Sequence, residues 1–372
     1  MKPCKPFLPS RNIVKKRQDG KEGTKTIKQA AIGFSKRQIM QLSKEALWQA
    51  SKQELLDLLN TGIFTAKPKT VYFYAPSFMY YKTSYYRSSQ FHFPTVSVTG
   101  TSCALNCKHC GGKVLETMQP AETPEQLLAV AAKMKRRGSS GCLISGGCTP
   151  NGVVPLRKFI STIGKIKREL GLRVLVHTGI IDSDTAVALR DAGVDAALTD
   201  IIGSDETVKK VYNLNVTIND YALSLRALQE AGLNFVPHVI VGLNEGKLKG
   251  ELDALNMISS VKPSALVVIG FMPIPGTLMA NVKPPQPADI AKVVALARLM
   301  FPRTPLALGC MRPKGKNRAE TDVLALKAGI DAIAFPSEEV IGYAEAQRYK
   351  FGFSSCCCAQ IYMDADSRNP SK

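Results

Sequence analysis

From residue 95 onward, short apolar runs alternate with longer segments whose apolar positions recur every three or four residues. The short runs have the length and composition of buried parallel strands, and the longer segments have the spacing of amphipathic helices. Gly or Ala-Gly follows several of the helical segments, as is common at helix C-termini. Eight strands are therefore expected, at residues 95–99, 142–145, 174–178, 196–200, 235–241, 266–272, 306–308 and 332–335.

The order of these elements decides the expected fold class. Helices are expected at residues 124–137, 156–170, 184–192, 221–231, 252–258, 289–300, 319–328 and 338–348. Eight β-then-α units in succession predict an α/β fold, a (β/α)8 TIM-type barrel whose active site lies at the C-terminal ends of the strands. A doubly wound open sheet remains the alternative.

The pattern divides the chain into four regions. Residues 1–34 form a basic tail with little order-forming pattern, which we expect to be disordered. Residues 35–94 form an N-terminal extension, helical over 35–60 and then aromatic, and the aromatic stretch is expected to pack in the core. The barrel covers residues 95–349, and a cysteine-rich C-terminal tail covers 350–372.

Charge and composition narrow the range of partners and compartments. The net charge of +19 favours an acidic partner, which could be nucleic acid, an anionic membrane or an acidic carrier protein. Aromatic residues do not interleave with the basic N-terminal run, which argues against nucleic acid. No apolar run is long enough to span a membrane, and the N-terminus lacks the apolar core of a signal peptide. Ten cysteines in a chain of this pattern indicate a reducing compartment, and we expect the cytoplasm.

Three cysteines, Cys103, Cys107 and Cys110, follow the first expected strand with the spacing C-x3-C-x2-C. Three thiolates this close can hold three corners of a 4Fe–4S cluster, and one iron would then stay open. Zinc is the alternative metal for this site. Structural zinc sites usually close all four positions with a second cysteine pair, and no such pair follows here.

Further candidates lie at the ends of later strands, where a barrel would place its active site. Two glycines, Gly146 and Gly147, would let the backbone approach a ligand closely. Asp200 ends the fourth expected strand, and the fifth continues into a loop that contains Gly242 and Glu245. The structural alternatives are a tight turn at the glycines and a helix N-cap at Asp200.

The cysteine spacing resembles that of radical S-adenosylmethionine (SAM) enzymes, and the strand-end motifs resemble those of their biotin-synthase-like subgroup. The resemblance implies that the open iron binds the methionine moiety of SAM. It also implies that His109 replaces the usual aromatic residue before the third cysteine, whereas His238 stands where the adenine-binding pattern has a glycine. The SAM contacts that it implies are His109, Gly146, Gly147, Asp200, Ile240, Gly242 and Glu245.

The remaining cysteines point to a more specific function. Residues 99–112, 145–148 and 308–313 resemble one component of the two-protein, archaeal-type lipoyl synthase, although the C-x4-C-x5-C motif of the single-chain enzyme is absent. This resemblance implies sulfur insertion into a protein-bound octanoyl chain. A second 4Fe–4S cluster would then supply the sulfur, and its candidate ligands are Cys310, Cys356, Cys357, Cys358 and Cys148. Cys142 is expected to be a packed thiol and Cys4 to be idle.

The implied partners are an acidic lipoyl domain or glycine-cleavage H protein, a related radical SAM enzyme, and an electron donor such as ferredoxin or flavodoxin. Two other classes stay open. A radical SAM isomerase or methyltransferase would share the barrel and the first cluster but would need no sulfur donor. A metal-binding scaffold without activity would need no ordered set of SAM motifs.

Overall fold

The computed structural model describes residues 8–9, 42–65, 69–89 and 91–366. Apart from the two-residue strand β1 (Leu8–Pro9), the basic tail predicted over residues 1–34 lies outside the described residues, as does Cys4. Among the described helices, none has both the length and the apolar character needed to cross a membrane.

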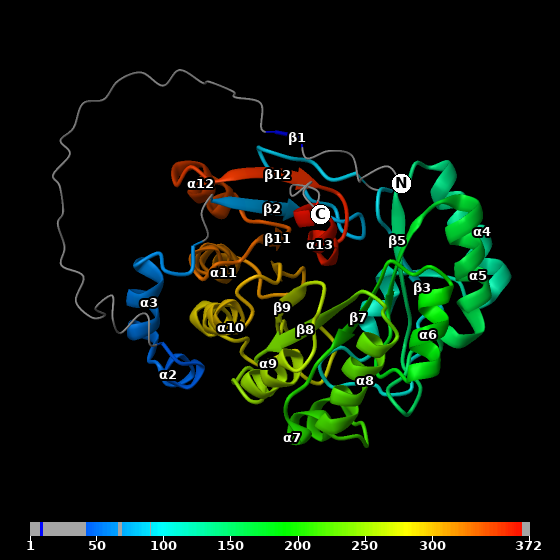
Figure 1. Cartoon of the computed structure of the whole chain (residues 1–372), viewed down its shortest axis with the longest axis horizontal. Helices are drawn as coiled ribbons and strands as arrows, with labels where there is room; N and C mark the ends of the chain where they lie inside the picture. Colours follow the sequence, from blue (N-terminus) through cyan, green and yellow to red (C-terminus); the bar gives the residue numbers. More distant parts are fainter. Residues whose placement is uncertain (1–7, 10–41, 66–68, 90, 367–372) are drawn as a thin grey trace.

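The eight predicted strands are all present, and they pair in parallel in the order of the sequence (Figure 1). Their burial on both faces explains the continuous apolar runs of the sequence. This consecutive order excludes the doubly wound alternative, in which the strand order reverses. The strands are β3 (Thr95–Ser97), β5 (Gly141–Ser145), β6 (Arg173–His177), β7 (Ala196–Asp200), β8 (Phe235–Val241), β9 (Leu266–Gly270), β10 (Leu306–Leu308) and β11 (Ala332–Ala334).

The sheet curls like a barrel wall and gains further strands at its two edges. The short strand β4 (Gln119–Pro120) lies beside β3. At the other edge, β2 (Thr70–Tyr74) pairs in parallel with both β11 and β12 (Lys350–Ser354), and β1 pairs with β12 in the antiparallel direction. The first part of the aromatic stretch is therefore a core strand of the sheet, whereas Met79 and Tyr80 farther along it are exposed, so the prediction of core packing is confirmed only in part.

Helices cover the outer face of the curled sheet (Figure 1). Side-chain caps fix where several of them begin, as at Thr123, Asp182 and Ser337. The main helical segments are α4 (Pro124–Arg136), α5 (Ile160–Lys165), α6 (Ser183–Asp191), α7 (Asp205–Thr207), α8 (Ile218–Glu230), α9 (Glu251–Ser259), α10 (Pro287–Met300), α11 (Lys316–Lys327) and α12 (Glu338–Ala346). The predicted helices are thus confirmed, some with shifted ends. A short 3-10 helix, η2 (Leu156–Phe159), precedes α5, and π-helical turns extend α5 and α7 as η3 (Ile166–Leu170) and η4 (Val208–Tyr212).

The single helix expected over residues 35–60 is two short helices in its described part, α2 (Lys44–Gln49) and α3 (Lys52–Asn60). Ser51 causes the break because its side chain caps α3, and Glu54 completes a capping box with it. Both helices pack against α10. Lys292 of α10 secures this packing by donating hydrogen bonds to the carbonyl oxygens of Trp48 and Ala50.

The cysteine-rich tail reaches the active-site edge because it begins as a strand. Helix α12 returns the chain to the N-terminal side of the sheet, and β12 then runs parallel to β2. The end of β12 therefore lies at the same edge as the ends of the other parallel strands. The 3-10 helix η5 (Cys358–Gln360) packs against β10 and β11 there, and the short helix α13 (Ile361–Asp366) follows it.

Candidate functional site

The loop after β3 brings Cys107 and Cys110 together at the C-terminal edge of the sheet. The sulfur atoms of these two cysteines and a ring nitrogen of His109 lie within 4.8 Å of one another. The N–H of Cys110 donates to the carbonyl oxygen of Cys107 over 3.2 Å, which tightens the turn between them. Asn106 adopts the left-handed conformation that this turn requires.

The thiols of this loop perturb one another. A hydrogen bond from Cys107, together with the nearby His109, lowers the pKa of Cys110 to about 4 despite burial. The same hydrogen bond and burial raise the pKa of Cys107, and the charge of Cys103 acts in the same direction. Cys110 is thus ready to act as a thiolate, the form that binds metal. The Nδ1 atom of His109 is buried and has no hydrogen-bond partner, so one potential ligand atom beside the two thiols is unused. These residues fit a 4Fe–4S cluster.

The glycine pair after β5 allows the cysteine loop to pack closely. A Cβ atom on Gly147 would lie 2.0 Å from the carbonyl oxygen of Ser102 and 2.6 Å from the Cα atom of Cys103. The N–H of Gly147 donates to Oγ1 of Thr99 over 2.7 Å. The next residue, Cys148, accepts a hydrogen bond from the N–H of Ala104 at its carbonyl oxygen.

The thiol of Cys148 lies beside the first cysteine loop. Burial and then the charge of Cys103 raise the pKa of Cys148 to about 12, with smaller contributions from Asp200 and Cys110. The structure thus groups Cys148 with the thiols of the β3 loop. Its proposed role as a ligand of the second cluster stays a prediction.

The inner face of the curled sheet carries a layer of polar side chains, and a layer of apolar side chains lies next to it. Side chains two positions apart on a strand share a face, so His177, Asp200 and His238 project on the inner face above Leu175, Leu198 and Val236, which belong to the inner core. Their ligand atoms lie within 4.8 Å of one another, and Nε2 of His177 lies 3.6 Å from Oδ1 of Asp200. In the sequence, His238 stands out only as a departure from a motif, and His177 has no local signal.

Electrostatic coupling favours charge on His177 and Asp200, whereas His238 is neutral. Burial opposes charge on Asp200 and His177, but their mutual attraction outweighs it, which lowers the pKa of Asp200 and raises that of His177. Burial lowers the pKa of His238 to about 4, so this ring is neutral at neutral pH. Asp200 therefore lies at the strand end as expected, with its carboxylate beside the ring of His177.

The loop after β8 contains the three predicted adenine-binding residues. Ile240 is half-buried on β8, and Gly242 has a φ of 74° that suits glycine. A Cβ atom there would lie 2.8 Å from the ring of Pro285. Glu245 is exposed and forms an ion pair of 2.7 Å with Lys210.

A buried acid that no sequence motif marks supports this loop. Oε1 of Glu251 accepts a hydrogen bond of 2.8 Å from the N–H of Gly242. Burial raises the pKa of Glu251 to about 7, although the hydrogen bond from Gly242 opposes the shift. Its Oε2 atom is buried without a partner. Glu251 lies in the first turn of α9, where acids are common, so no sequence signal set it apart.

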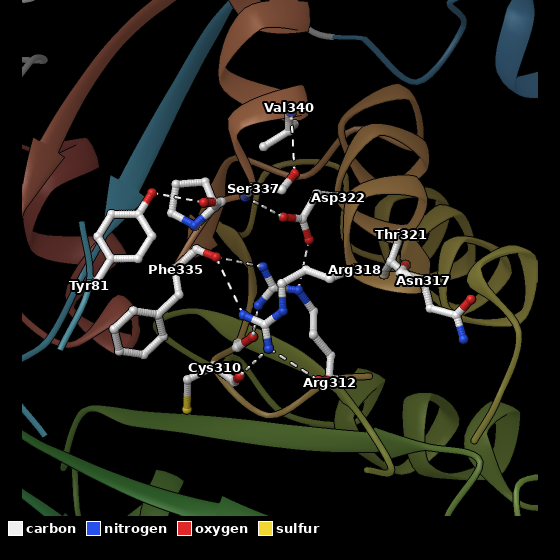
Figure 2. Close-up of polar contacts among 12 residues, drawn as sticks. Tyr81, Cys310, Arg312, Asn317, Arg318, Thr321, Asp322, Phe335, Ser337 and Val340 are labelled. Atoms are coloured by element: carbon white, nitrogen blue, oxygen red, sulfur yellow. Dashed lines mark hydrogen bonds and ion pairs between the residues drawn. The ribbon is translucent and has the colours of Figure 1, made fainter. Parts of the chain in front are cut away.

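A network of buried polar groups holds Cys310, in the loop after β10 (Figure 2). Arg312 is fully buried, and its Nε atom donates to Oδ1 of Asp322 over 2.7 Å. Arg318 donates to the carbonyl oxygens of Cys310 and Arg312 over 3.4 and 3.1 Å. Figure 2 shows the sulfur of Cys310 pointing away from both guanidinium groups. Burial raises the pKa of its thiol to about 11.

The tail brings Cys357 and Cys358 close to Cys310, as their mutual electrostatic effects show. A hydrogen bond with Cys358 lowers the pKa of Cys357, and the same bond and burial raise that of Cys358. The charge of His177 also acts on Cys357, which places the tail beside the inner polar layer. Cys356 is disulfide-bonded and therefore offers no thiolate, which corrects its prediction as a ligand, and its sulfur lies 3.8 Å from the hydroxyl of Ser140. Cys142 is fully buried within β5, in agreement with its prediction as a packed thiol.

Comparison with known proteins agrees with this geometry. The model of the radical SAM superfamily matches residues 97–253. Biotin synthase of Buchnera aphidicola (subsp. Acyrthosiphon pisum, strain APS) is 28% identical over 249 residues, which cover 64% of this chain and 70% of that protein. Biotin synthase of Rickettsia felis is 28% identical over 255 residues, which cover 66% and 80%.

Solved structures support the fold. The crystal structure of methylornithine synthase matches with a TM-score of 0.57 at 16% identity and covers 88% of this chain and 96% of its own. The FeFe-hydrogenase maturase from Carboxydothermus hydrogenoformans matches with a TM-score of 0.57 at 15% identity and covers 87% and 80%.

Residues 97–253, which contain the cysteine loop and the motifs after β5, β7 and β8, therefore match the radical SAM superfamily, and this family implies a 4Fe–4S cluster and SAM as cofactors. The curated homologues of this chain include biotin synthases, at about 28% identity.

Proposed function

We propose that this protein inserts sulfur into an unactivated carbon, as one component of a two-protein lipoyl synthase that acts on a protein-bound octanoyl chain. The observation that carries the proposal is a second set of thiols at the active-site edge. The loop after β10 and the tail after β12 bring Cys310, Cys357 and Cys358 to the edge that also holds the cysteine loop after β3.

The chemistry requires a radical because an unactivated methylene has no acidic proton and no leaving group. A reduced 4Fe–4S cluster and SAM supply a 5′-deoxyadenosyl radical, which can remove hydrogen from such a carbon. Cys103, Cys107 and Cys110 would hold this cluster. Apolar side chains of the inner core, such as Leu175 and Val236, close the space beneath the polar layer and keep water from entering from below.

The second set of thiols would hold the sulfur donor. Thiolates from Cys310, Cys357 and Cys358 would ligate an auxiliary cluster, and Cys148 is the other candidate ligand. Cys356, which was also predicted as a ligand, is excluded because its sulfur is in a disulfide bond. Sulfur taken from that cluster would not be replaced during the reaction. We therefore expect no more than about one insertion per chain when no cluster-resupply system is present.

Iron and sulfide analysis tests the proposal against related radical SAM activities. A sulfur-inserting enzyme should contain about eight iron atoms and eight sulfides per chain, whereas an isomerase or methyltransferase with a single cluster should contain about four of each. Cys310→Ala should still release 5′-deoxyadenosine but should form no carbon–sulfur bond. Mass spectrometry of an octanoylated lipoyl-domain peptide, after reaction with reduced enzyme and SAM, measures the product. Unimpaired product from this variant would contradict the proposal.

The first cluster has its own test. Replacing Cys103, Cys107 and Cys110 together by Ala should abolish reductive cleavage of SAM, as measured by 5′-deoxyadenosine release. Cleavage at the parental rate would contradict the radical SAM assignment of this loop. The proposed partners are an acidic lipoyl domain or H protein, a related radical SAM enzyme, and a ferredoxin or flavodoxin as electron donor.

A further inference from the structure

The network behind Cys310 contains two guanidinium groups and a single carboxylate (Figure 2). Asp322 is fully buried, and both of its oxygen atoms are occupied. Oδ1 accepts from Nε of Arg312 over 2.7 Å, and Oδ2 accepts from the N–H of Ser337 over 2.9 Å. Arg312 also donates to the carbonyl oxygens of Gly309 and Phe335. The Arg312–Asp322 pair therefore has no net charge, and neither oxygen of Asp322 lacks a hydrogen bond.

Arg318 adds a positive charge that no carboxylate balances. Its guanidinium group donates only to carbonyl oxygens, those of Cys310, Arg312 and Phe335, over 3.1–3.4 Å. Its Nε atom is buried without a hydrogen-bond partner. Within the described part of the chain, no Asp or Glu forms an ion pair with Arg318. Burial and then the neighbouring charge of Arg312 lower the pKa of Arg318 to about 10, so it is still charged at neutral pH.

The position of Arg318 on its helix increases the imbalance. It lies in the first turn of α11, and Lys316 precedes it there, with no acidic residue in that turn. The N-terminal end of a helix carries a partial positive charge and favours acids over bases. The nearest phenol, Tyr81, cannot serve as the counter-ion, because it donates to the carbonyl oxygen of Pro336 and burial raises its pKa.

Buried charges in proteins are paired or bind an ion, because an uncompensated one is costly. The group near Arg318 that can become anionic is the thiol of Cys310. Arg318 contacts the carbonyl oxygen of this residue and feels the charge of its thiol, although the sulfur points away from the guanidinium group, so the two charges interact across a distance. We propose that Arg318 is the charge partner of an anionic auxiliary cluster ligated by Cys310, and that its guanidinium group raises the reduction potential of this cluster. The inference rests on the proposed function, because it requires the second cluster.

The expected effect follows from electrostatics. Reduction adds negative charge to a cluster, so a fixed positive charge nearby favours the reduced state. The effect should be stronger for Arg318, which is half-buried with its Nε atom fully buried, than for Lys316, which is exposed and screened by water. Lys316→Gln therefore removes the same charge from the same helix turn and provides a matched control.

The experiment measures the auxiliary cluster alone. In the full chain with Cys103, Cys107 and Cys110 replaced by Ala, this cluster would be the only one, and a mediated redox titration followed by electron paramagnetic resonance gives its potential. Arg318→Gln should lower the reduced-to-oxidised ratio at a fixed potential about tenfold, which corresponds to a shift of about −59 mV for a one-electron couple. Arg318→Lys, which keeps the charge, and Lys316→Gln should leave the potential near the parental value.

The outcomes separate the inference from the proposed function. A triple-Ala parent without cluster iron would overturn both the proposed function and this inference. An intact cluster whose potential is unchanged in Arg318→Gln would overturn the role of Arg318 alone, as would equal shifts in the Gln and Lys variants. If Arg318→Gln loses the cluster, retention of iron in Arg318→Lys supports charge compensation. Loss of iron in both variants would show that the carbonyl contacts matter instead, which overturns the inference.

Discussion

Replacing Asp322 by Ala should destabilise the protein strongly, because it leaves a buried cation without its partner. Arg312 and Asp322 are both 0% exposed, and Nε of Arg312 lies 2.7 Å from Oδ1 of Asp322. Leaving one partner of a buried ion pair unpaired costs about 3–5 kcal/mol. The N–H of Ser337 would also lose its acceptor, at about 1–3 kcal/mol. We therefore expect a loss of at least about 4 kcal/mol in the free energy of unfolding.

Denaturant unfolding followed by circular dichroism measures this loss, and two further variants test its cause. Glu245→Ala breaks the ion pair of Glu245 with Lys210, which has the same 2.7 Å separation. The side chain of Lys210 is 39% exposed and that of Glu245 is 48% exposed. This substitution should cost less than about 1 kcal/mol, because exposed pairs contribute little. Combining Arg312→Met with Asp322→Leu removes both buried charges and should recover more than half of the loss. If Asp322→Ala and Glu245→Ala had similar costs, burial would not be the deciding factor.

Three further changes have outcomes that the structure predicts. Gly147→Ala should displace the cysteine loop and lower the iron content of the first cluster, because its Cβ atom would lie 2.0 Å from a backbone oxygen, whereas Gly342→Ala meets no atom within 4 Å and should not. The pKa of Glu251 is raised to about 7, so the folded protein binds this proton more tightly than the unfolded chain. Stability should therefore fall as the pH rises from about 4.5 to about 7, by about 3 kcal/mol, and Glu251→Gln should remove this dependence in unfolding measured across that range. The affinity for an acidic lipoyl domain, measured by calorimetry, should decrease steeply with ionic strength, and salt-independent binding would contradict the proposed partner class.

The sequence predicted the strands that can be recognised locally. The eight strands from β3 to β11, leaving out the short β4, are buried on both faces, so they appear as apolar runs between helical segments. The strand β12 was missed because its five residues, Lys350–Ser354, include Lys and Gly and lack a strong apolar run. It forms because β2 offers it a partner from the other end of the chain. A sequence pattern does not show such a distant pairing.

The same distinction applies to the candidate site. The cysteine loop and the glycine pair are local motifs, so their positions could be predicted. The polar layer of His177, Asp200 and His238 forms only when three strands align, and the charge of Arg318 matters only because the fold buries it. Single residues of these common types carry no signal before the fold places them together.

The position of β2 between β11 and β12 has a consequence for the order of assembly. During synthesis, β2 emerges early but finds both of its partners only near the end of the chain. The loop that contains Cys103 lies beside strands that are close in sequence, β3 and β5, whereas Cys357 and Cys358 follow β12, whose parallel partner β2 lies at the other end of the chain. Contacts between distant segments form slowly. A nascent chain should therefore complete the first thiol set well before the second, so the two metal centres would be loaded at separate times.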